Sequence, residues 1–162
     1  MTMHRPATVD SKEGLDKLLT LIEDVTSRLP IVFPIHPRTV KRIGEFGMKD
    51  RLDAIQRLIL TDPMDYFSFQ KLIKYARFIL TDSGGIQEES TFRQVPCLTL
   101  RPNTERPSTV DIGSNELVTF DLHRLNQKVD DIMEGRFKQG EVPPMWDGLA
   151  SHRIVKVLEE VL

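Results

Sequence analysis

Three absences limit what this chain of 162 residues can be. It has one cysteine, Cys97, so it has no internal disulfide framework, and a reducing, cytoplasmic setting is expected. No apolar run approaches the roughly 20 residues that span a bilayer, and no signal peptide is visible. The formal net charge is −2 and no block of Lys or Arg occurs. We therefore expect neither nucleic acid nor a membrane as a partner.

Short apolar segments alternate with amphipathic ones along the chain. The apolar segments are hydrophobic on both sides, which is typical of a parallel sheet covered by helices on both faces. The amphipathic segments have helical spacing, and Asp10 with Glu13 predicts a capping pair before the first. The predicted fold class is therefore α/β, with a Rossmann-like parallel sheet. The predicted strands are 31–35, 58–60, 78–80, 97–100 and 116–118, and the predicted helices are 15–25, 40–46, 69–76, 86–92, 122–133 and 150–161.

One stretch, Thr81 to Glu89, has the features of a phosphate-binding turn, because it follows a predicted strand and opens a predicted helix. The first N–H groups of a helix have no intrahelical partner and carry partial positive charge, which suits a phosphate. Gly84 and Gly85 would let the backbone approach a ligand and adopt positive φ at little cost. Glu89 lies about one turn beyond Gly85, within reach of a sugar hydroxyl. The alternative is an ordinary strand-to-helix connection without a ligand.

Polar residues follow several predicted strands directly. The carboxyl ends of parallel strands meet at one edge of the sheet, and ligands bind there near the switch point. We therefore expect one cluster at that edge, made of His4, His36, the turn 83–85 and the loop 101–106. Cys97 lies in an apolar run and is predicted to be a buried small hydrophobe rather than a nucleophile.

Six motifs occur together and in order, and as a set they resemble the carboxyl-terminal half of non-hydrolysing UDP-N-acetylglucosamine 2-epimerases. The resemblance covers essentially all 162 residues. It implies the carboxyl-terminal half of a glycosyltransferase-B-type fold, in which two Rossmann-like domains face a cleft. The motifs are Thr-x-His-Arg-Pro at 2–6, Phe-Pro-Ile-His-Pro-Arg at 33–38, Asp-Pro-x-x-Tyr at 62–66, Thr-Asp-Ser-Gly-Gly-Ile-Gln-Glu-Glu at 81–89, Thr-Glu-Arg-Pro at 104–107 and Trp-Asp-Gly at 146–148.

The resemblance implies a reaction and a set of site residues. UDP-GlcNAc and UDP-ManNAc would interconvert by elimination and re-addition of UDP, with no metal or nicotinamide cofactor. The absence of a G-x-G-x-x-G fingerprint agrees with that. His4 would be the catalytic histidine beside the diphosphate, and His36 would lie near a second, regulatory UDP-GlcNAc site. The substrate contacts would be Arg5, Phe69 near the uracil, Ser83, Gly84 and Gly85 at the diphosphate, Glu89 at the ribose, and Arg106 at a phosphate.

One departure from the family pattern concerns length. Family members carry an amino-terminal domain that supplies the carboxylates for the C2 proton, and these 162 residues do not contain it. We therefore expect a single UDP-binding domain over residues 1–162, truncated within its first strand at Met1. We expect it to be inactive alone and, with an incomplete sheet, able to form a homo-oligomer. Ala7 also stands where the family often has Glu, which affects the loop after Arg5.

Three other functions stay open. They are a hydrolysing UDP-GlcNAc 2-epimerase that releases free ManNAc, a UDP-sugar glycosyltransferase domain, and a stand-alone nucleotide-binding module. The Gly84-Gly85 turn followed by Gln87-Glu88-Glu89 favours the non-hydrolysing enzyme, because hydrolysing relatives usually differ there. The missing domain favours the stand-alone module as a description of this particular chain.

Overall fold

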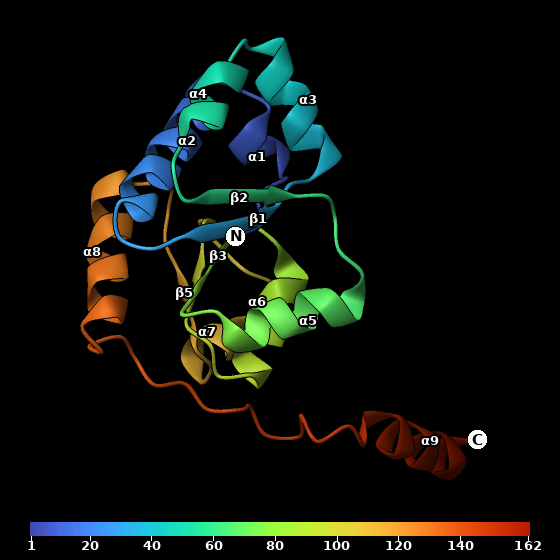
Figure 1. Ribbon diagram of the computed structural model, residues 1–162. Helices are drawn as coiled ribbons and strands as arrows, with labels where there is room; N and C mark the ends of the chain where they lie inside the picture. The colour runs from blue at the N-terminus through green and yellow to red at the C-terminus, as the bar shows by residue number, and fades with distance from the viewer.

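The computed structural model describes residues 1–162 and contains five parallel strands in two hydrogen-bonded groups (Figure 1). One group pairs β1 with β2, and the other has the order β3-β4-β5. All pairings are parallel, as the apolar pattern predicts. The strands are β1 (Ile31–Pro34), β2 (Leu58–Thr61), β3 (Ile79–Thr81), β4 (Cys97–Thr99) and β5 (Asn115–Leu117).

Residues 1–3 lie between the two groups of strands. Thr2 forms a parallel bridge with Thr81, and its N–H donates to the Leu80 carbonyl at 3.0 Å. On the other side the Met1 amino group donates to the Val32 carbonyl at 2.8 Å. The chain therefore passes from this central segment out to β1 and β2 and then returns to β3 on its opposite side. That reversal is the switch point of the sheet.

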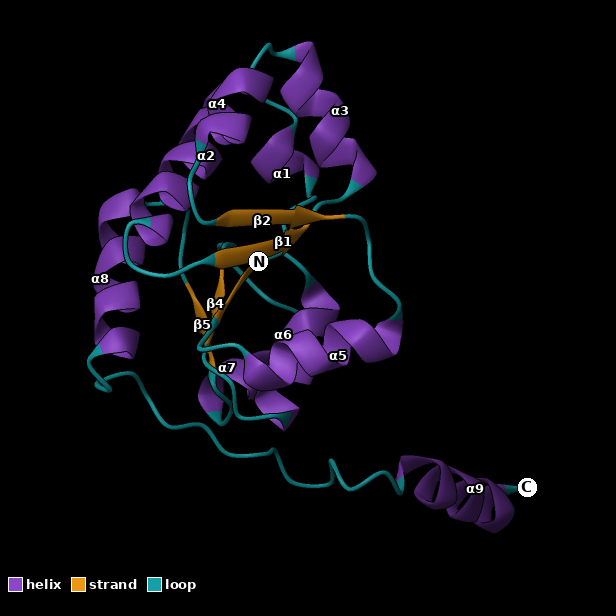
Figure 2. Ribbon diagram, viewed as in Figure 1, coloured by secondary structure: helices purple, strands orange, loops and turns teal.

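Helices cover both faces of the sheet. This follows from the side chains of successive strand residues, which pack into two different hydrophobic clusters. Leu80 and Leu98 belong to the larger cluster, which also contains buried side chains of α2 (Lys12–Thr26) and α8 (Leu122–Met133). Ile79 and Cys97, one residue earlier in each strand, belong to a smaller cluster. That cluster includes Ile73 of α5 (Tyr66–Tyr75) and Ile86 of α6 (Gly84–Phe92). The predicted two-faced α/β sheet is confirmed, and Figure 2 shows its layers.

The predicted helices are all present, with ends that differ by a few residues. Three short helices were not predicted: α1 (Pro6–Val9), α4 (Lys49–Ala54) and α7 (Pro107–Asp111). Two of these begin with proline at the first helical turn, a signal available in the sequence. The two remaining predicted helices are α3 (Pro37–Glu45) and α9 (Ala150–Val161).

The predicted capping pair before the first long helix is wrong by one residue. Ser11 is the N-cap of α2, and its hydroxyl accepts from the Gly14 N–H at 3.0 Å. Asp10 instead forms ion pairs with Arg38 and Arg42 of α3. These contacts lower the pKa of Asp10 to about 2, chiefly through the hydrogen bond from Arg38. Asp10 thus ties the start of α2 to α3.

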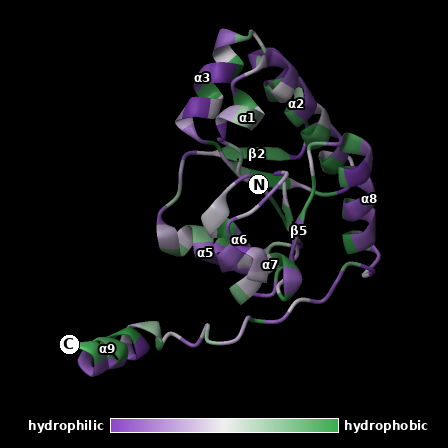
Figure 3. Cartoon of the chain, turned by 180° about the vertical axis from the view of Figure 1, so that it is seen from behind, coloured by the Kyte–Doolittle hydropathy of each residue, from purple (hydrophilic) through white to green (hydrophobic).

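Two predicted elements form but are less buried than expected. β2 is an edge strand, and Ile59 is 49% exposed rather than covered on both sides. The amphipathic α9 has no buried residue and lies apart from the sheet (Figure 3). Its apolar residues, including Ile154 and Val161, are exposed. None of the helices combines the length and the hydropathy that crossing a bilayer requires.

Candidate functional site

The amino end of α6 lies directly after β3, at the carboxyl edge of the sheet. Ser83 is the N-cap, but its side chain makes no capping hydrogen bond with the helix. The Ser83 N–H donates to the Thr81 hydroxyl at 3.0 Å. The first turn of α6 therefore presents N–H groups that no side chain of this cap satisfies, with the positive end of the helix dipole behind them.

The predicted backbone of the two glycines is wrong. Gly84 and Gly85 are the first two residues of α6, not a separate turn, and neither has positive φ. A Cβ at Gly84 would stand 2.7 Å from Oε1 of Glu105, so a larger residue there would displace that flexible side chain. Gly85 is exposed, and a Cβ there would meet nothing within 4 Å. Only Gly85 therefore leaves open space over the helix terminus.

A buried carboxylate, Asp82, fixes the loop after the central segment. The backbone N–H groups of His4 and Arg5 donate to its Oδ2 at 3.0 and 2.9 Å. Nδ1 of His4 lies 3.3 Å from Oδ1. Asp82 is fully buried, so these donors replace the water that a carboxylate requires. Asp82 was not predicted as a site residue, although its position between a predicted strand and the two glycines could have indicated one.

His4 and His36 lie together at this edge, as predicted. Their rings stack with centroids 5.3 Å apart and planes inclined by 30°. His36 is also the N-cap of α3, where its Nδ1 accepts from the Arg38 N–H at 3.1 Å. Its side chain therefore caps the start of a helix as well as stacking on His4. With Nδ1 of His4 turned to Asp82, Nε2 is the ring nitrogen left for another partner.

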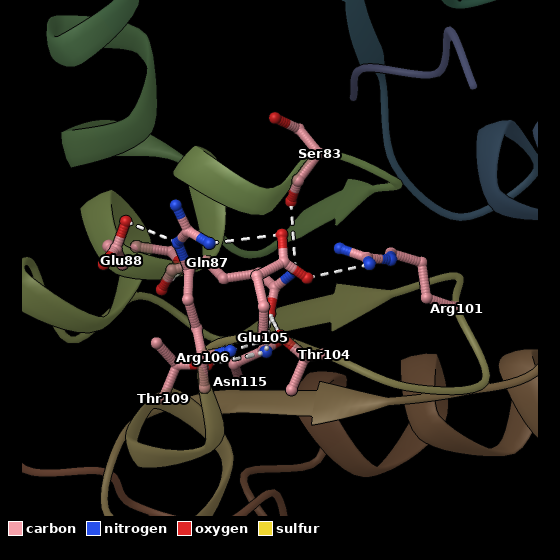
Figure 4. Close-up of polar contacts among 10 residues, drawn as sticks. Ser83, Gln87, Glu88, Arg101, Thr104, Glu105, Arg106, Thr109 and Asn115 are labelled. Carbon is pink, nitrogen blue, oxygen red and sulfur yellow. Dashed lines mark hydrogen bonds and ion pairs between the residues drawn. The ribbon is translucent and has the colours of Figure 1, made fainter.

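Arg106 is part of a chain of ion pairs over the start of α6 (Figure 4). Its Nε lies 2.6 Å from Oε2 of Glu88, and its Nη1 lies 3.1 Å from Oε1 of Glu105. The other Glu105 oxygen accepts from Arg101 at 2.8 Å. The hydrogen bond from Arg101, reinforced by the charges of both arginines, lowers the pKa of Glu105 to about 2. These four residues are called the outer ion-pair chain below.

Beneath this chain is a set of neutral polar side chains, here called the inner network. Oε1 of Gln87 accepts from Thr104 at 2.7 Å and from Asn115 at 3.1 Å. Asn115 also donates to Thr109 at 3.1 Å and accepts from Thr99 at 2.7 Å. The Thr104 hydroxyl in turn accepts from the Arg106 N–H at 3.0 Å. The inner network therefore fixes the backbone that carries Arg106, and none of its members was predicted.

Glu89 projects from α6 toward α5. Its Oε2 accepts from Nε2 of Gln70 at 2.7 Å, and Oε1 of Gln70 accepts from Arg93 at 2.8 Å. Burial raises the pKa of Glu89 above its ordinary value, against the opposing effect of the Gln70 hydrogen bond. Phe69, next to Gln70, packs against the smaller hydrophobic cluster and lines an apolar cavity of about 310 Å³.

The predicted site residues thus divide into two groups. His4, Arg5, Ser83, Gly84 and Gly85 lie at the start of α6 with Arg106, and His36 stacks on His4. Glu89 and Phe69 lie further along, on the α5 side. Cys97 is fully buried and burial raises its pKa to about 11, which confirms a packing role. No group of three or more His, Cys, Asp or Glu side chains is arranged to hold a metal ion.

Comparison with known proteins gives relatives over nearly the whole chain. A UDP-N-acetylglucosamine 2-epimerase from Methanocaldococcus jannaschii is 41% identical over 160 residues, 98% of this chain and 43% of that protein. The enzyme of that name from Escherichia coli K12 is 31% identical over 155 residues, 90% of this chain and 40% of its own length. The chain therefore spans less than half the length of these curated relatives.

Solved structures also match nearly the whole of this chain and less than half of each relative. The M. jannaschii UDP-GlcNAc 2-epimerase in complex with UDP-GlcNAc and UDP superposes with a TM-score of 0.85 at 39% identity, covering 98% of this chain and 44% of that one. The Neisseria meningitidis enzyme bound to UDP-GlcNAc gives a TM-score of 0.83 at 28% identity, covering 98% and 43%. The family model of UDP-N-acetylglucosamine 2-epimerase matches residues 1–159, and this chain belongs to that family.

Proposed function

We propose that residues 1–162 form one UDP-binding domain of a non-hydrolysing UDP-GlcNAc 2-epimerase. The observation that carries the proposal is the start of α6, where Ser83 leaves the helix uncapped and Gly85 is open to solvent. Arg106 lies over the same turn. A diphosphate there would accept from backbone N–H groups and from the Arg106 guanidinium, which would exchange its contacts with Glu88 and Glu105 for phosphate oxygens.

The remaining contacts follow from the positions of neighbouring side chains. Glu89 lies about one turn beyond Gly85, where its carboxylate would accept hydrogen bonds from the ribose hydroxyls. Phe69 lies beside Gln70, which binds Glu89, and takes the uracil side of the ligand. The backbone of His4 and Arg5 is held next to the start of α6 by Asp82, which lies two residues before Gly84. His4 would be the catalytic histidine beside the diphosphate, and Arg5 would contact the substrate.

This arrangement suits elimination of UDP. As the bond from the sugar to UDP breaks, the diphosphate gains negative charge, and donors already fixed at that point stabilise the transition state. The M. jannaschii relative was solved with UDP-GlcNAc and UDP, which supports the same ligand class here. The Gly84-Gly85 start of α6, followed by Gln87-Glu88-Glu89, supports the non-hydrolysing reaction. His36, stacked on His4, would extend toward a regulatory UDP-GlcNAc.

Calorimetry with UDP and with uridine tests the phosphate role. We expect UDP to bind at least tenfold more tightly, because a hydrogen bond to a charged group contributes about 1.5–3 kcal/mol. Titration with inorganic pyrophosphate should compete with UDP, since both would occupy the start of α6. Equal affinities for UDP and uridine, or no binding of either, would show that the helix terminus is not a phosphate site.

We infer that these 162 residues alone do not move the C2 proton. The carboxylates near the site are engaged: Asp82 by backbone N–H groups, and Glu88 and Glu105 by arginines. Glu89 is held by Gln70 at one oxygen, and its other oxygen would be engaged by the ribose hydroxyls. A general base needs a free carboxylate within hydrogen-bond reach of the carbon acid. NMR of UDP-GlcNAc in deuterated water should therefore show no exchange at C2 above the protein-free control, and exchange would contradict the inference.

A further inference from the structure

We propose that Gln70 is a positioning residue that holds Glu89 in the orientation needed to bind the ribose hydroxyls. This rests on the proposed function, in which Glu89 contacts the ribose. Gln70 comes from α5 and Glu89 from α6, so the contact joins two elements that form one side of the site. Neither Gln70 nor its second partner Arg93 has any place in the motifs that resemble the epimerase family.

The orientation of the Gln70 amide follows from its two partners. Arg93 donates its Nε–H to one end of the amide at 2.8 Å, and a guanidinium has no acceptor. That end must therefore be the oxygen. The nitrogen then faces Glu89, where it donates to Oε2 at 2.7 Å. Arg93, the C-cap of α6, lies one turn after Glu89, so the Gln70 side chain from α5 forms hydrogen bonds with both.

The contact leaves one Glu89 oxygen free. Oε2 is occupied by Gln70, whereas Oε1 accepts no hydrogen bond within the chain. A carboxylate held at one oxygen presents the other in a fixed direction, which lowers the cost of ordering it when a ligand binds. The two adjacent hydroxyls of a ribose are donors of the kind that Oε1 accepts.

The environment of Gln70 supports this role over a purely structural one. Only 7% of Gln70 is exposed, and it lies beside the smaller hydrophobic cluster. A hydrophobic residue would fill that position without needing hydrogen-bond partners. Burial raises the pKa of Glu89 above its ordinary value, and the hydrogen bond from Gln70 opposes that shift, so the contact favours the ionised carboxylate over the protonated one.

The test compares UDP with 2′,3′-dideoxy-UDP, which lacks the ribose hydroxyls, by calorimetry on the full chain. Gln70→Met keeps the length of the side chain and removes both polar groups. Gln127→Met is the matched control, because Gln127 is an exposed glutamine of α8 outside the site. Affinity for the dideoxy ligand reports whether each variant folds and retains its phosphate site.

The wild type should bind UDP at least tenfold more tightly than the dideoxy ligand, as expected for a hydroxyl bound to a carboxylate. In Gln70→Met that preference should fall to within about threefold, with unchanged affinity for the dideoxy ligand. Arg93→Ala, a change at an exposed position, should lower the preference partly, because the amide can then rotate. Arg93→Lys should restore it, since lysine also only donates.

The outcomes separate the two proposals. If the wild type prefers UDP and Gln70→Met keeps the full preference, Glu89 does not need Gln70 and the positioning role is wrong. The same conclusion follows if Gln70→Met does not fold and Arg93→Ala keeps the full preference. If the wild type binds neither nucleotide, the proposed function is wrong and the positioning role falls with it. Loss of preference in Gln127→Met as well would show an unspecific effect and would also overturn the proposal.

Discussion

The inner network and the outer ion-pair chain lie within one hydrogen bond of each other and differ in almost every property. The inner network is neutral, and Gln87, Thr99, Thr109 and Asn115 are fully buried. The outer ion-pair chain is charged, and its Arg106 and Glu105 side chains are 31% and 48% exposed. They meet at Thr104, whose hydroxyl donates to Gln87 and accepts from the Arg106 backbone (Figure 4).

The difference indicates a division of roles at one sheet edge. Buried hydrogen bonds are costly to break, because the remaining polar group cannot form a replacement hydrogen bond with water. Exposed ion pairs contribute little to stability and can exchange partners with a ligand. We therefore expect substitutions in the inner network to act on stability, and substitutions in the outer ion-pair chain to act on binding. The predictions below test that separation.

The largest effect is expected from Asn115→Leu in the inner network. The substitution removes three hydrogen bonds, to Gln87, Thr99 and Thr109, and leaves the buried Thr99 hydroxyl without its oxygen acceptor. At about 1 kcal/mol for each bond, the free energy of unfolding should fall by about 3 kcal/mol, as measured by urea denaturation. Asn126→Leu in α8 is the comparison variant: it removes two hydrogen bonds, with Arg28 and Asp24, but these are only partly buried, so its loss of stability should be smaller. A loss below about 1 kcal/mol would mean that the network does not stabilise this edge.

Arg106→Ala should show the opposite pattern. It removes a cation from the proposed phosphate site, so UDP affinity should fall by about 1.5–3 kcal/mol, which is at least tenfold. Its ion pairs with Glu88 and Glu105 are partly exposed, so the free energy of unfolding should change by less than about 1 kcal/mol. Arg136→Ala, which removes an exposed ion pair with Asp131, is the control. It should change the UDP affinity and the free energy of unfolding by less than about 1 kcal/mol each. Unchanged UDP affinity in Arg106→Ala would remove Arg106 from the site.

The two glycines of α6 sharpen the comparison. Gly85→Ala adds a methyl group in open space within a helix, so stability should rise by about 0.5 kcal/mol. The same methyl group would stand where the diphosphate binds, and UDP affinity should fall about tenfold. Gly84→Ala instead displaces Glu105, whose Oε1 lies 2.7 Å from the added carbon. It should perturb the outer ion-pair chain, and crystal structures of both variants would check which side chain moves.

The sequence predicts the edge better than it predicts the site built on it. Parallel order follows from strands that are apolar on both sides, and the carboxyl-edge cluster of His4, His36 and Ser83 follows from the strand ends. These are consequences of local pattern and of one topological rule. The stacking of His4 on His36 and the burial of Asp82 need the actual strand order, which places residues 1–3 between β1 and β3.

The inner network shows what pattern reasoning misses. Thr99, Asn115 and Gln87 are ordinary polar residues at the end of one strand, the start of another and inside a helix. Only the register of β4 against β5, which pairs Cys97 with Asn115, brings their side chains together. Gln70 was missed for the same reason, since its partners lie about 20 residues away on another helix. The contact of Gly84 with Glu105 was likewise not predicted, because these residues are about 20 positions apart in the sequence.

The smallest expected effect is a pH dependence confined to acid. Glu105 has a pKa of about 2, below the ordinary value of 4.5, chiefly because of the hydrogen bond from Arg101. A depressed carboxyl pKa means that the folded state binds the proton less readily than the unfolded state. The stabilisation is therefore fully present above about pH 4.5 and is lost as the pH falls toward 2. In urea denaturation, wild type and Glu105→Gln should differ by a constant amount from pH 7 to about pH 5 and converge below it. A difference that already shrinks between pH 7 and 5 would show that Glu105 is not held by the arginines of the outer ion-pair chain.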